Sequence, residues 1–343
     1  MAITGINYPW LNYGWDFGDP PAGWTGGQDP EAFRAAQRTV IAADLRDLAA
    51  LGVTLVRWFV LADGLSYGLG TGAPHADGRF FVLPPRDPAI GRIVADFRHL
   101  LDLCAAAGVK LIPSHIDFHW CFPASAVSDG VVKGGRAIVL KDETQRRIFL
   151  DTVLEPLLEA SRARPEAIYA WEPMNEPEWC TGGSEWKFWE RPTSKNRTVS
   201  REDMRDFLKE SIERVNRAGF VSTIGFAHWD TIQAWGTEDW EIGLQQFHYY
   251  AQGGAALPAA ADVTSQPCLL GEFASLPAKA WPGEAQSLDA RLKHAVDLGY
   301  AGSLVWSMRA KDDATLWDQQ QRVMLASYHG RPAPVTPAVW EVE

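Results

Sequence analysis

The chain has 343 residues, of which 46% are hydrophobic and 22% charged, and this composition excludes a wholly disordered protein. Acidic residues outnumber basic ones by 43 to 32, and the formal charge of −11 argues against nucleic acid as a partner, because phosphates would be repelled. No stretch approaches the roughly twenty apolar residues of a membrane span, and the first residues lack the pattern of a secretory signal. We therefore expect a globular cytoplasmic protein without a membrane partner, or a secreted one if a leader was removed, with its oligomeric state open.

Short apolar segments alternate with segments of helical periodicity along almost the whole chain. Eight strands are predicted to begin near Ile3, Val53, Val109, Ala167, Val221, Gly243, Pro267 and Ala301. Eight βα units predict a single (β/α)8 TIM barrel with long aromatic-rich loops at its C-terminal face, where the active site of such a barrel lies. An open doubly wound sheet would need a glycine-rich phosphate turn after the first strand, and residues 9–27 lack one. We assign residues 1–330 to the catalytic barrel and residues 331–343 to a C-terminal tail packed on it or trailing from it.

The second predicted strand ends with a charged residue in an inward position. Arg57 is in phase with Val53 and Leu55, which point into the barrel. A buried guanidinium needs carboxylates close by, and Glu272 is the natural partner. This ion pair would also keep Glu272 ionised.

The third predicted strand ends with three polar residues that alternate. His115, Asp117 and His119 are therefore predicted to face one side, as in a metal-binding strand. One strand cannot surround an ion alone, and no other histidine-rich element supplies ligands. A hydrogen-bonded polar layer in the barrel mouth is the favoured interpretation, with His119 nearest the substrate. Neither a metal nor a cofactor is predicted.

Two glutamates end the fourth and seventh strands. Glu176 lies in the segment 169–179, Tyr-Ala-Trp-Glu-Pro-Met-Asn-Glu-Pro-Glu-Trp, and Glu272 lies in Cys-Leu-Leu-Gly-Glu-Phe. Two carboxyls in one cleft suit glycoside hydrolysis, since one protonates the leaving oxygen while the other stays ionised and either attacks or stabilises the cationic sugar carbon. Glu172 and Glu178 flank Glu176, but the first precedes the strand end and the second lies beyond a proline.

Aromatic residues mark the remaining strand ends. His248 and Tyr250 share a face after the sixth strand, and a phenol beside a carboxylate can orient it. Most of the 16 tryptophans fall at strand ends or in the loops that follow, where flat aromatic faces can stack on sugar rings. The tryptophans predicted to contact substrate are Trp306, Trp10, Trp120, Trp179 and Trp229.

The four cysteines show no metal spacing, and cytosolic thiols usually stay reduced. Cys104 and Cys268 are interpreted as core residues. Cys121 and Cys180 follow the third and fourth strands, close to the cleft, and structural filling is their favoured role.

The polar residues at the strand ends resemble those of clan A glycoside hydrolases, and most closely glycoside hydrolase family 5, the cellulase and mannanase family. The resemblance spans about residues 3–308 and rests on eight positions in the order of the family, namely Arg57, His119, Asn175, Glu176, His248, Tyr250, Glu272 and Trp306. It implies that Glu176 is the general acid/base, Glu272 the nucleophile and Asn175 a hydrogen-bond partner of the sugar 2-hydroxyl. The long aromatic loops match no single substrate-defined subgroup.

These observations predict a retaining hydrolase of β-linked gluco- or manno-configured oligosaccharides or polysaccharides that forms a covalent glycosyl-enzyme. Sugar identity, linkage and endo or exo action stay open. A transglycosylase would use the same intermediate and is an alternative within this class. A non-catalytic glycan-binding barrel would have no need for both glutamates. A metal-dependent hydrolase built on His115, Asp117 and His119 is the third alternative.

Overall fold

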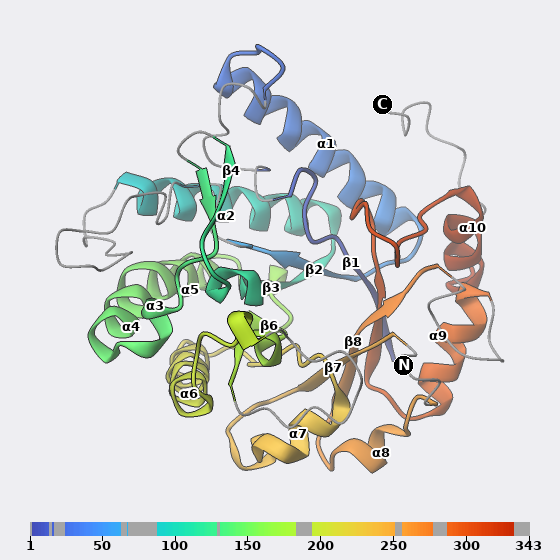
Figure 1. Ribbon diagram of the computed structural model, residues 1–343. Coiled ribbons are helices and arrows are strands. Elements are labelled where there is room, and N and C mark those ends of the chain that lie inside the picture. The colour runs from blue at the N-terminus through green and yellow to red at the C-terminus, as the bar shows by residue number, and fades with distance from the viewer. Residues whose placement is uncertain are drawn as a thin grey trace.

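Seven parallel strands form one curled sheet in the computed structural model, with helices around its outside (Figure 1). The structure describes residues 2–13, 16, 25–62, 67, 88–128, 131–182, 194–250, 256–276 and 287–332. The strands of the sheet are β1 (Ile3–Asn7), β2 (Leu55–Phe59), β3 (Lys110–Asp117), β6 (Glu172–Asn175), β7 (Gln245–Tyr249), β8 (Cys268–Ala274) and β9 (Gly302–Trp306). Their order in the sheet is β6-β3-β2-β1-β9-β8-β7. This order follows the chain around a ring, as repeated βα units require.

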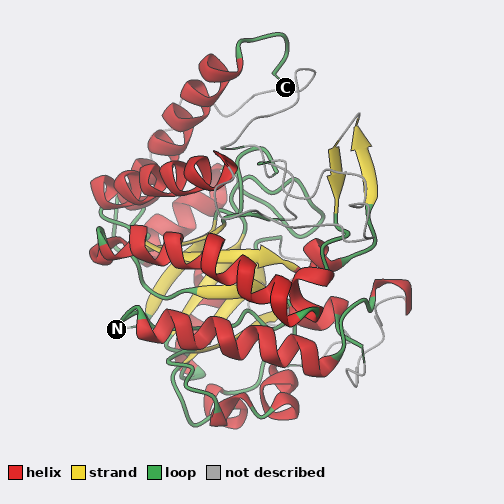
Figure 2. Cartoon of the chain, turned by 90° about the vertical axis from the view of Figure 1, so that its left-hand side faces the viewer, coloured by secondary structure: helices red, strands yellow, loops and turns green. Residues whose placement is uncertain are grey.

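The helices are α1 (Pro30–Ala50), α2 (Pro88–Ala107), α3 (Ile138–Lys141), α4 (Glu143–Phe149), α5 (Glu155–Arg162), α6 (Arg201–Arg217), α7 (Trp229–Trp235), α8 (Ala260–Val263), α9 (Leu288–Asp297) and α10 (Gln319–Tyr328). Helix α6 begins directly after Ser200, whose hydroxyl accepts a hydrogen bond from the Asp203 N–H. An antiparallel hairpin of β4 (Ser125–Ser128) and β5 (Val131–Lys133) stands apart from the sheet (Figure 2). No helix of the described residues combines the length and the apolar character needed to cross a bilayer.

The strands bury apolar side chains on both faces, as expected of a sheet with helices outside it. The inner cluster comes from six segments around the ring and consists of Leu55, Ile112, Ala170, Leu244, Leu269 and Leu304. A much larger cluster fills the layer between the sheet and the helices. The polar side chains at the carboxyl ends of the strands therefore lie above an apolar layer inside the curled sheet.

The fifth predicted strand, expected to begin near Val221, is not a continuous strand. Its residues instead make isolated parallel bridges, Trp171 with Ser222 and Asn175 with Gly225 on one side, and Phe226 with Phe247 on the other. The fourth strand also begins later than its predicted start near Ala167, at Glu172. Of the predicted tail, residues 333–343 lie outside the described residues, so the division at residue 330 stays a prediction.

Candidate active site

Polar side chains gather at the carboxyl ends of the strands. Arg57 comes from β2, Asp117 from β3, Asn175 from β6, His248 from β7 and Glu272 from β8. Two further residues follow directly after a strand: Glu176 after β6 and Tyr250 after β7. The carboxyl ends of parallel strands meet at one edge of a barrel, so the fold brings together residues that are far apart in the sequence.

Arg57 is the centre of this cluster and is fully buried. Its Nε and Nη2 donate to the two carboxylate oxygens of Glu172 at 2.8 and 2.6 Å. Nη1 donates to Asn7 Oδ1 at 3.0 Å and to Glu272 Oε1 at 2.5 Å, and Nη2 also donates to Asn175 Oδ1 at 2.6 Å. The guanidinium thus makes five hydrogen bonds, the number of its N–H groups. The predicted pair with Glu272 is present, together with a second carboxylate.

Glu172, which we did not expect to be catalytic because it precedes the strand end, is the second partner of the Arg57 guanidinium. Its side chain is fully buried, and it also accepts from the Ser114 hydroxyl at 2.7 Å and from Gln246 Nε2 at 2.6 Å. A Cβ added to Gly225 would lie 2.9 Å from Gln246 Nε2 and 3.0 Å from both Arg57 Nη2 and Glu172 Oε1. Only glycine, which has no Cβ, leaves enough space for the hydrogen bonds of Arg57, Glu172 and Gln246. The signal in the sequence was the buried arginine, whose five N–H groups call for more acceptors than the two oxygens of one carboxylate.

Glu272 is almost fully buried and is held by several donors. Besides Arg57, it accepts from the Tyr250 hydroxyl, which donates to Oε2 at 2.5 Å, and His248 Nδ1 lies 3.5 Å from the same oxygen. Burial raises the pKa of Glu272, and the charge of Glu176 adds to this, whereas His248, Arg57 and the Tyr250 hydrogen bond oppose it. These donors favour the ionised form of this carboxyl.

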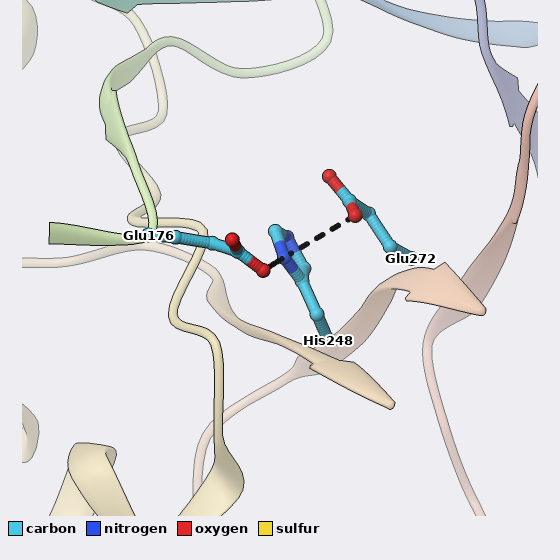
Figure 3. A group of neighbouring side chains, drawn as sticks. All are labelled: Glu176, His248 and Glu272. Atoms are coloured by element: carbon cyan, nitrogen blue, oxygen red, sulfur yellow. Dashed lines mark hydrogen bonds and ion pairs between the residues drawn. The ribbon is translucent and has the colours of Figure 1, made fainter. Parts of the chain in front are cut away.

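Glu176 lies across from Glu272, with His248 between the two (Figure 3). Its backbone is in the left-handed region, with φ of 44°, and its N–H donates to the carbonyl of Gly225 at 2.7 Å. Such a conformation is unusual for a residue with a side chain, and residues that adopt it cluster at functional sites. Burial, followed by the charge of Asp117, raises the pKa of Glu176 to about 8. This glutamate therefore keeps a proton at neutral pH.

His248 is the bridge of the pair, since its Nδ1 lies 2.7 Å from Glu176 Oε1. Burial lowers the pKa of His248 to about 4, so the imidazole is neutral over the ordinary pH range. One ligand-type atom from each of Glu176, His248 and Glu272 lies within 4.8 Å of the others. The two carboxyls are therefore close enough to act on one small group.

Asn175 and His119 complete the polar rim through Asp117. Asn175 Nδ2 donates to Asp117 Oδ2 at 2.8 Å, while the other oxygen of Asp117 lies 2.5 Å from His119 Nδ1. The His119 side chain is 36% exposed, so it can reach a ligand. Asp117 thus links Asn175, the residue before Glu176, to His119.

Aromatic residues flank the two glutamates on different sides. Trp306 packs with Phe59 and with the partly exposed Trp10 and Tyr250, close to Glu272, and its indole N–H donates to Asp312 at 2.7 Å. On the side of Glu176, partly exposed Trp179 lies 6.1 Å from Phe118, measured between ring centroids. Trp229, at the start of α7, is partly exposed and contacts Phe247. Other tryptophans of the predicted loops, Trp15, Trp24, Trp186, Trp189 and Trp281, lie outside the described residues.

Two expectations about β3 and its loop are wrong. Trp120 does not reach the site, because it is fully buried against Phe149 at a centroid distance of 5.5 Å. His115 also stacks on Phe149, in the layer between sheet and helices, and does not join Asp117. Ser114 and Asp117 both bond side chains inside the ring although three positions separate them, so the strict alternation behind the prediction is interrupted here.

The separation of these residues also removes the metal site expected from the third alternative. His115 points away from Asp117 and His119, and burial lowers its pKa to about 3. The cluster of Glu176, His248 and Glu272 does have the donor types and the spacing for an ion. The Arg57 guanidinium, 2.5 Å from Glu272, supplies the positive charge that a metal would otherwise bring.

Comparisons with known proteins agree with this site. No family model matches the sequence. The mannan endo-1,4-beta-mannosidase of Cryptopygus antarcticus is 20% identical over 352 residues, covering 92% of this chain and 82% of that protein. This chain is similar to a β-mannanase.

Solved structures extend the similarity. The β-1,4-D-mannanase of Cryptopygus antarcticus has a TM-score of 0.67 and 19% identity, covering 96% of this chain and 90% of that one. For the endo-1,4-β-mannanase of Eisenia fetida the TM-score is 0.67 at 21% identity, with 96% and 91% covered. An exo-β-1,4-mannosidase from an Opitutaceae bacterium has a TM-score of 0.57 at 14% identity, with 96% and 59% covered. The sheet of parallel strands thus matches the barrel fold of mannanases, and the predicted resemblance to family 5 glycoside hydrolases is confirmed.

Proposed function

We propose that this protein is a retaining glycoside hydrolase that cleaves β-1,4-linked mannans or manno-oligosaccharides. The observation that carries the proposal is the pair of Glu176 and Glu272, which lie within 4.8 Å of each other through one oxygen each and have unlike partners. A retaining pair needs its carboxyl groups about 5 to 5.5 Å apart, whereas inversion needs roughly 6.5 to 9.5 Å. The names of the related proteins favour a manno-configured substrate over a gluco-configured one.

In the first step, protonated Glu176 donates its proton to the glycosidic oxygen while the Glu272 carboxylate attacks the anomeric carbon. The bond from that carbon to the leaving oxygen breaks, and an ester bond to Glu272 forms. Arg57 and Tyr250 hold the attacking carboxylate in place through their hydrogen bonds to its two oxygens. Because the pKa of Glu176 is raised to about 8, this residue still carries the proton at neutral pH.

In the second step, ionised Glu176 takes a proton from water, and the resulting hydroxide attacks the same carbon from the face that the leaving group vacated. The ester bond breaks and Glu272 regains its charge, so both residues return to their starting states. His248 stays neutral and contacts Glu176 through Nδ1, so it can steady this carboxyl in both of its protonation states. Asn175, next to Glu176, is the proposed partner of the sugar 2-hydroxyl.

The aromatic residues near Glu272 and those near Glu176 suggest how a sugar chain lies in the site. The sugar that is attacked must sit against Glu272, beside Trp306 and Trp10. The leaving part of the substrate must sit against the acid, on the side of His119 and Trp179. Flat rings on both sides suit a chain of pyranose rings.

We also propose that residues 222–226 occupy the eighth position of the barrel, between β6 and β7. Bridges to Trp171 and Asn175 on one side and to Phe247 on the other support this placement. In this arrangement the barrel occupies residues 1–330, and residues 331–343 form a tail.

The test is a set of manno- and gluco-configured β-1,4 oligosaccharides and polysaccharides, with product masses and the anomeric configuration followed over time. Mannan cleavage with retention is expected, and the sizes of the first products separate endo from exo action. An inverted first product would contradict the mechanism. A lack of turnover together with binding would favour the non-catalytic glycan-binding barrel, and dominant transfer to added sugar would favour the transglycosylase.

A matched variant identifies the nucleophile. Glu272→Ala should lower kcat by more than about 10³-fold while the protein stays folded, and azide should restore turnover by entering the vacated side. The rescued product should be a glycosyl azide of inverted configuration. Full activity in Glu272→Ala would remove Glu272 from the mechanism.

A further inference from the structure

Two buried cysteines, Cys121 and Cys180, are neighbours close to the proposed catalytic acid Glu176. Cys121 ends the short 3-10 helix η2 (Phe118–Cys121), and Cys180 ends the corresponding helix η5 (Pro177–Cys180). Both side chains are fully buried, and the thiol of Cys180 is within hydrogen-bonding reach of the thiol of Cys121. Both are free thiols in this structure.

The backbone gives independent evidence that these two residues are neighbours. The Thr198 hydroxyl donates to the carbonyl of Cys121 at 2.6 Å, and the N–H of the next residue, Val199, donates to the carbonyl of Cys180 at 3.1 Å. Consecutive residues of one segment therefore bind the carbonyls of both cysteines. The ends of η2 and η5 are thus held side by side by the chain as well as by their side chains.

The other two cysteines differ from this pair. Cys104 lies on α2 and Cys268 begins β8, and burial alone raises the pKa of Cys104 and of Cys268, to about 12 in each case. Neither shows a neighbouring thiol. The chain therefore contains its own controls for the behaviour of an isolated buried thiol.

We propose that Cys121 and Cys180 form a disulfide bond that joins η2 to η5, a modification site beside the catalytic acid. With a low-molecular-weight disulfide such as oxidised glutathione, one protein thiolate attacks it and releases one glutathione. The second protein thiolate then attacks the mixed disulfide and releases the other. The two protein thiols lose two electrons and two protons, and the glutathione disulfide takes them up.

The bond would tie together two segments that carry site residues. His119 belongs to η2, and Glu176 directly precedes η5. Burial and the neighbouring Cys121 raise the pKa of the Cys180 thiol well above its usual range, so thiolate is scarce in the folded protein. Exchange is therefore expected while the chain folds, or when the two segments open briefly.

The test follows the four cysteines by mass in two arms. In one arm the native protein is incubated over a range of oxidised to reduced glutathione ratios, and in the other the reduced, unfolded chain refolds in the same buffers. After acid quenching, free thiols are alkylated under denaturing conditions and peptides are mapped. The expected product is a peptide pair linked through Cys121 and Cys180, while Cys104 and Cys268 are alkylated. Full alkylation of Cys121 and Cys180 in both arms, or a predominance of any other pairing, overturns the proposal.

A stability measurement shows whether the bond acts on the fold. It closes a loop of about 60 residues, so oxidation should raise the melting temperature by about 5 °C. This shift should disappear in Cys121→Ser and in Cys180→Ser, and it should persist in the control Cys104→Ser. A shift that survives in Cys121→Ser would show that another site is responsible. Neither readout depends on catalysis, so failure of the proposed hydrolase activity leaves this test intact.

Discussion

The proton on Glu176 sets the chemistry of the site at the scale of single residues. A general acid must hold its proton, and the pKa of Glu176 is raised to about 8, first by burial. We therefore expect kcat/KM on an oligosaccharide to fall about tenfold per unit as the pH rises beyond about 8. A rate profile from pH 4 to 10 measures this.

A neighbouring residue provides the control for this profile. Glu178 is buried, and its pKa is also raised to about 8 by burial, but its Oε1 accepts from the Ala227 N–H instead of facing His248. Glu178→Gln should leave the alkaline limb in place, whereas Glu176→Gln should remove the limb together with most of the activity. Loss of the alkaline limb in Glu178→Gln would contradict the prediction, because the titrating proton would then belong to Glu178 and not to Glu176.

His115 makes stability depend on pH. Burial lowers its pKa from 6.5 to about 3, and neither ring nitrogen has a hydrogen-bond partner among the described residues. Between these two values the unfolded chain binds a proton that the folded chain does not, so the free energy of unfolding falls as the pH falls. His115→Phe keeps a ring on Phe149 and removes this loss, which is on the order of a few kcal/mol. Urea unfolding at pH 8 and pH 4 measures it, and an equal drop in both proteins would contradict the prediction.

A chelator tests whether the two carboxylates act without a metal ion. Arg57 already places a positive charge 2.5 Å from Glu272, so the proposed reaction needs no metal. EDTA should leave activity unchanged. Added Zn²⁺ should instead inhibit, because Glu176, His248 and Glu272 present carboxylate and imidazole donors at suitable spacing. A loss of activity in EDTA that zinc reverses would contradict this.

At the scale of elements, the segment 222–226 depends on a glycine. Gly225→Ala would bring a methyl group within 3.0 Å of Arg57 and Glu172, so we expect a loss of about 1 to 3 kcal/mol in stability together with a fall in kcat. Gly91→Ala is the control, since nothing lies within 4 Å of a Cβ there and the residue is exposed on α2. This change should stabilise the protein by about 0.5 to 1 kcal/mol. Thermal unfolding and kcat of both variants test the pair, and a neutral Gly225→Ala would contradict the prediction.

The elements themselves were predictable where the sequence carries a regular pattern. Six strands begin within two residues of their predicted starts, from Ile3 to Gly302, because apolar runs before polar residues mark them. The faces of β3 were not predictable, since an interrupted alternation sends His115 outward and Asp117 inward. The segment 222–226 was mistaken for a regular strand because its apolar residues do not reveal isolated bridges.

At the scale of the whole molecule, the order of residues along the chain predicted which side chains meet. Arg57, Asn175, Glu176, His248, Tyr250 and Glu272 converge because each lies in the C-terminal part of a parallel strand or directly after it. The supporting network of Asn7, Ser114, Glu172 and Gln246 was missed. Each of these four is a common polar residue within a strand, and only the folded sheet shows that all of them bind one guanidinium or its partner.

The five hydrogen bonds of Arg57 link catalysis to folding. They reach Asn7, Glu172, Asn175 and Glu272, which come from β1, β6 and β8. An intermediate that lacks β6 or β8 would leave the buried guanidinium short of one of its two carboxylates, and one that lacks β1 would leave it short of a hydrogen bond, each of which is unfavourable. In a urea titration, enzymatic rate and near-ultraviolet circular dichroism should therefore vanish along a single curve. Partly folded molecules would contribute no turnover, so the enzymatic rate would measure the fraction of fully folded molecules in a sample.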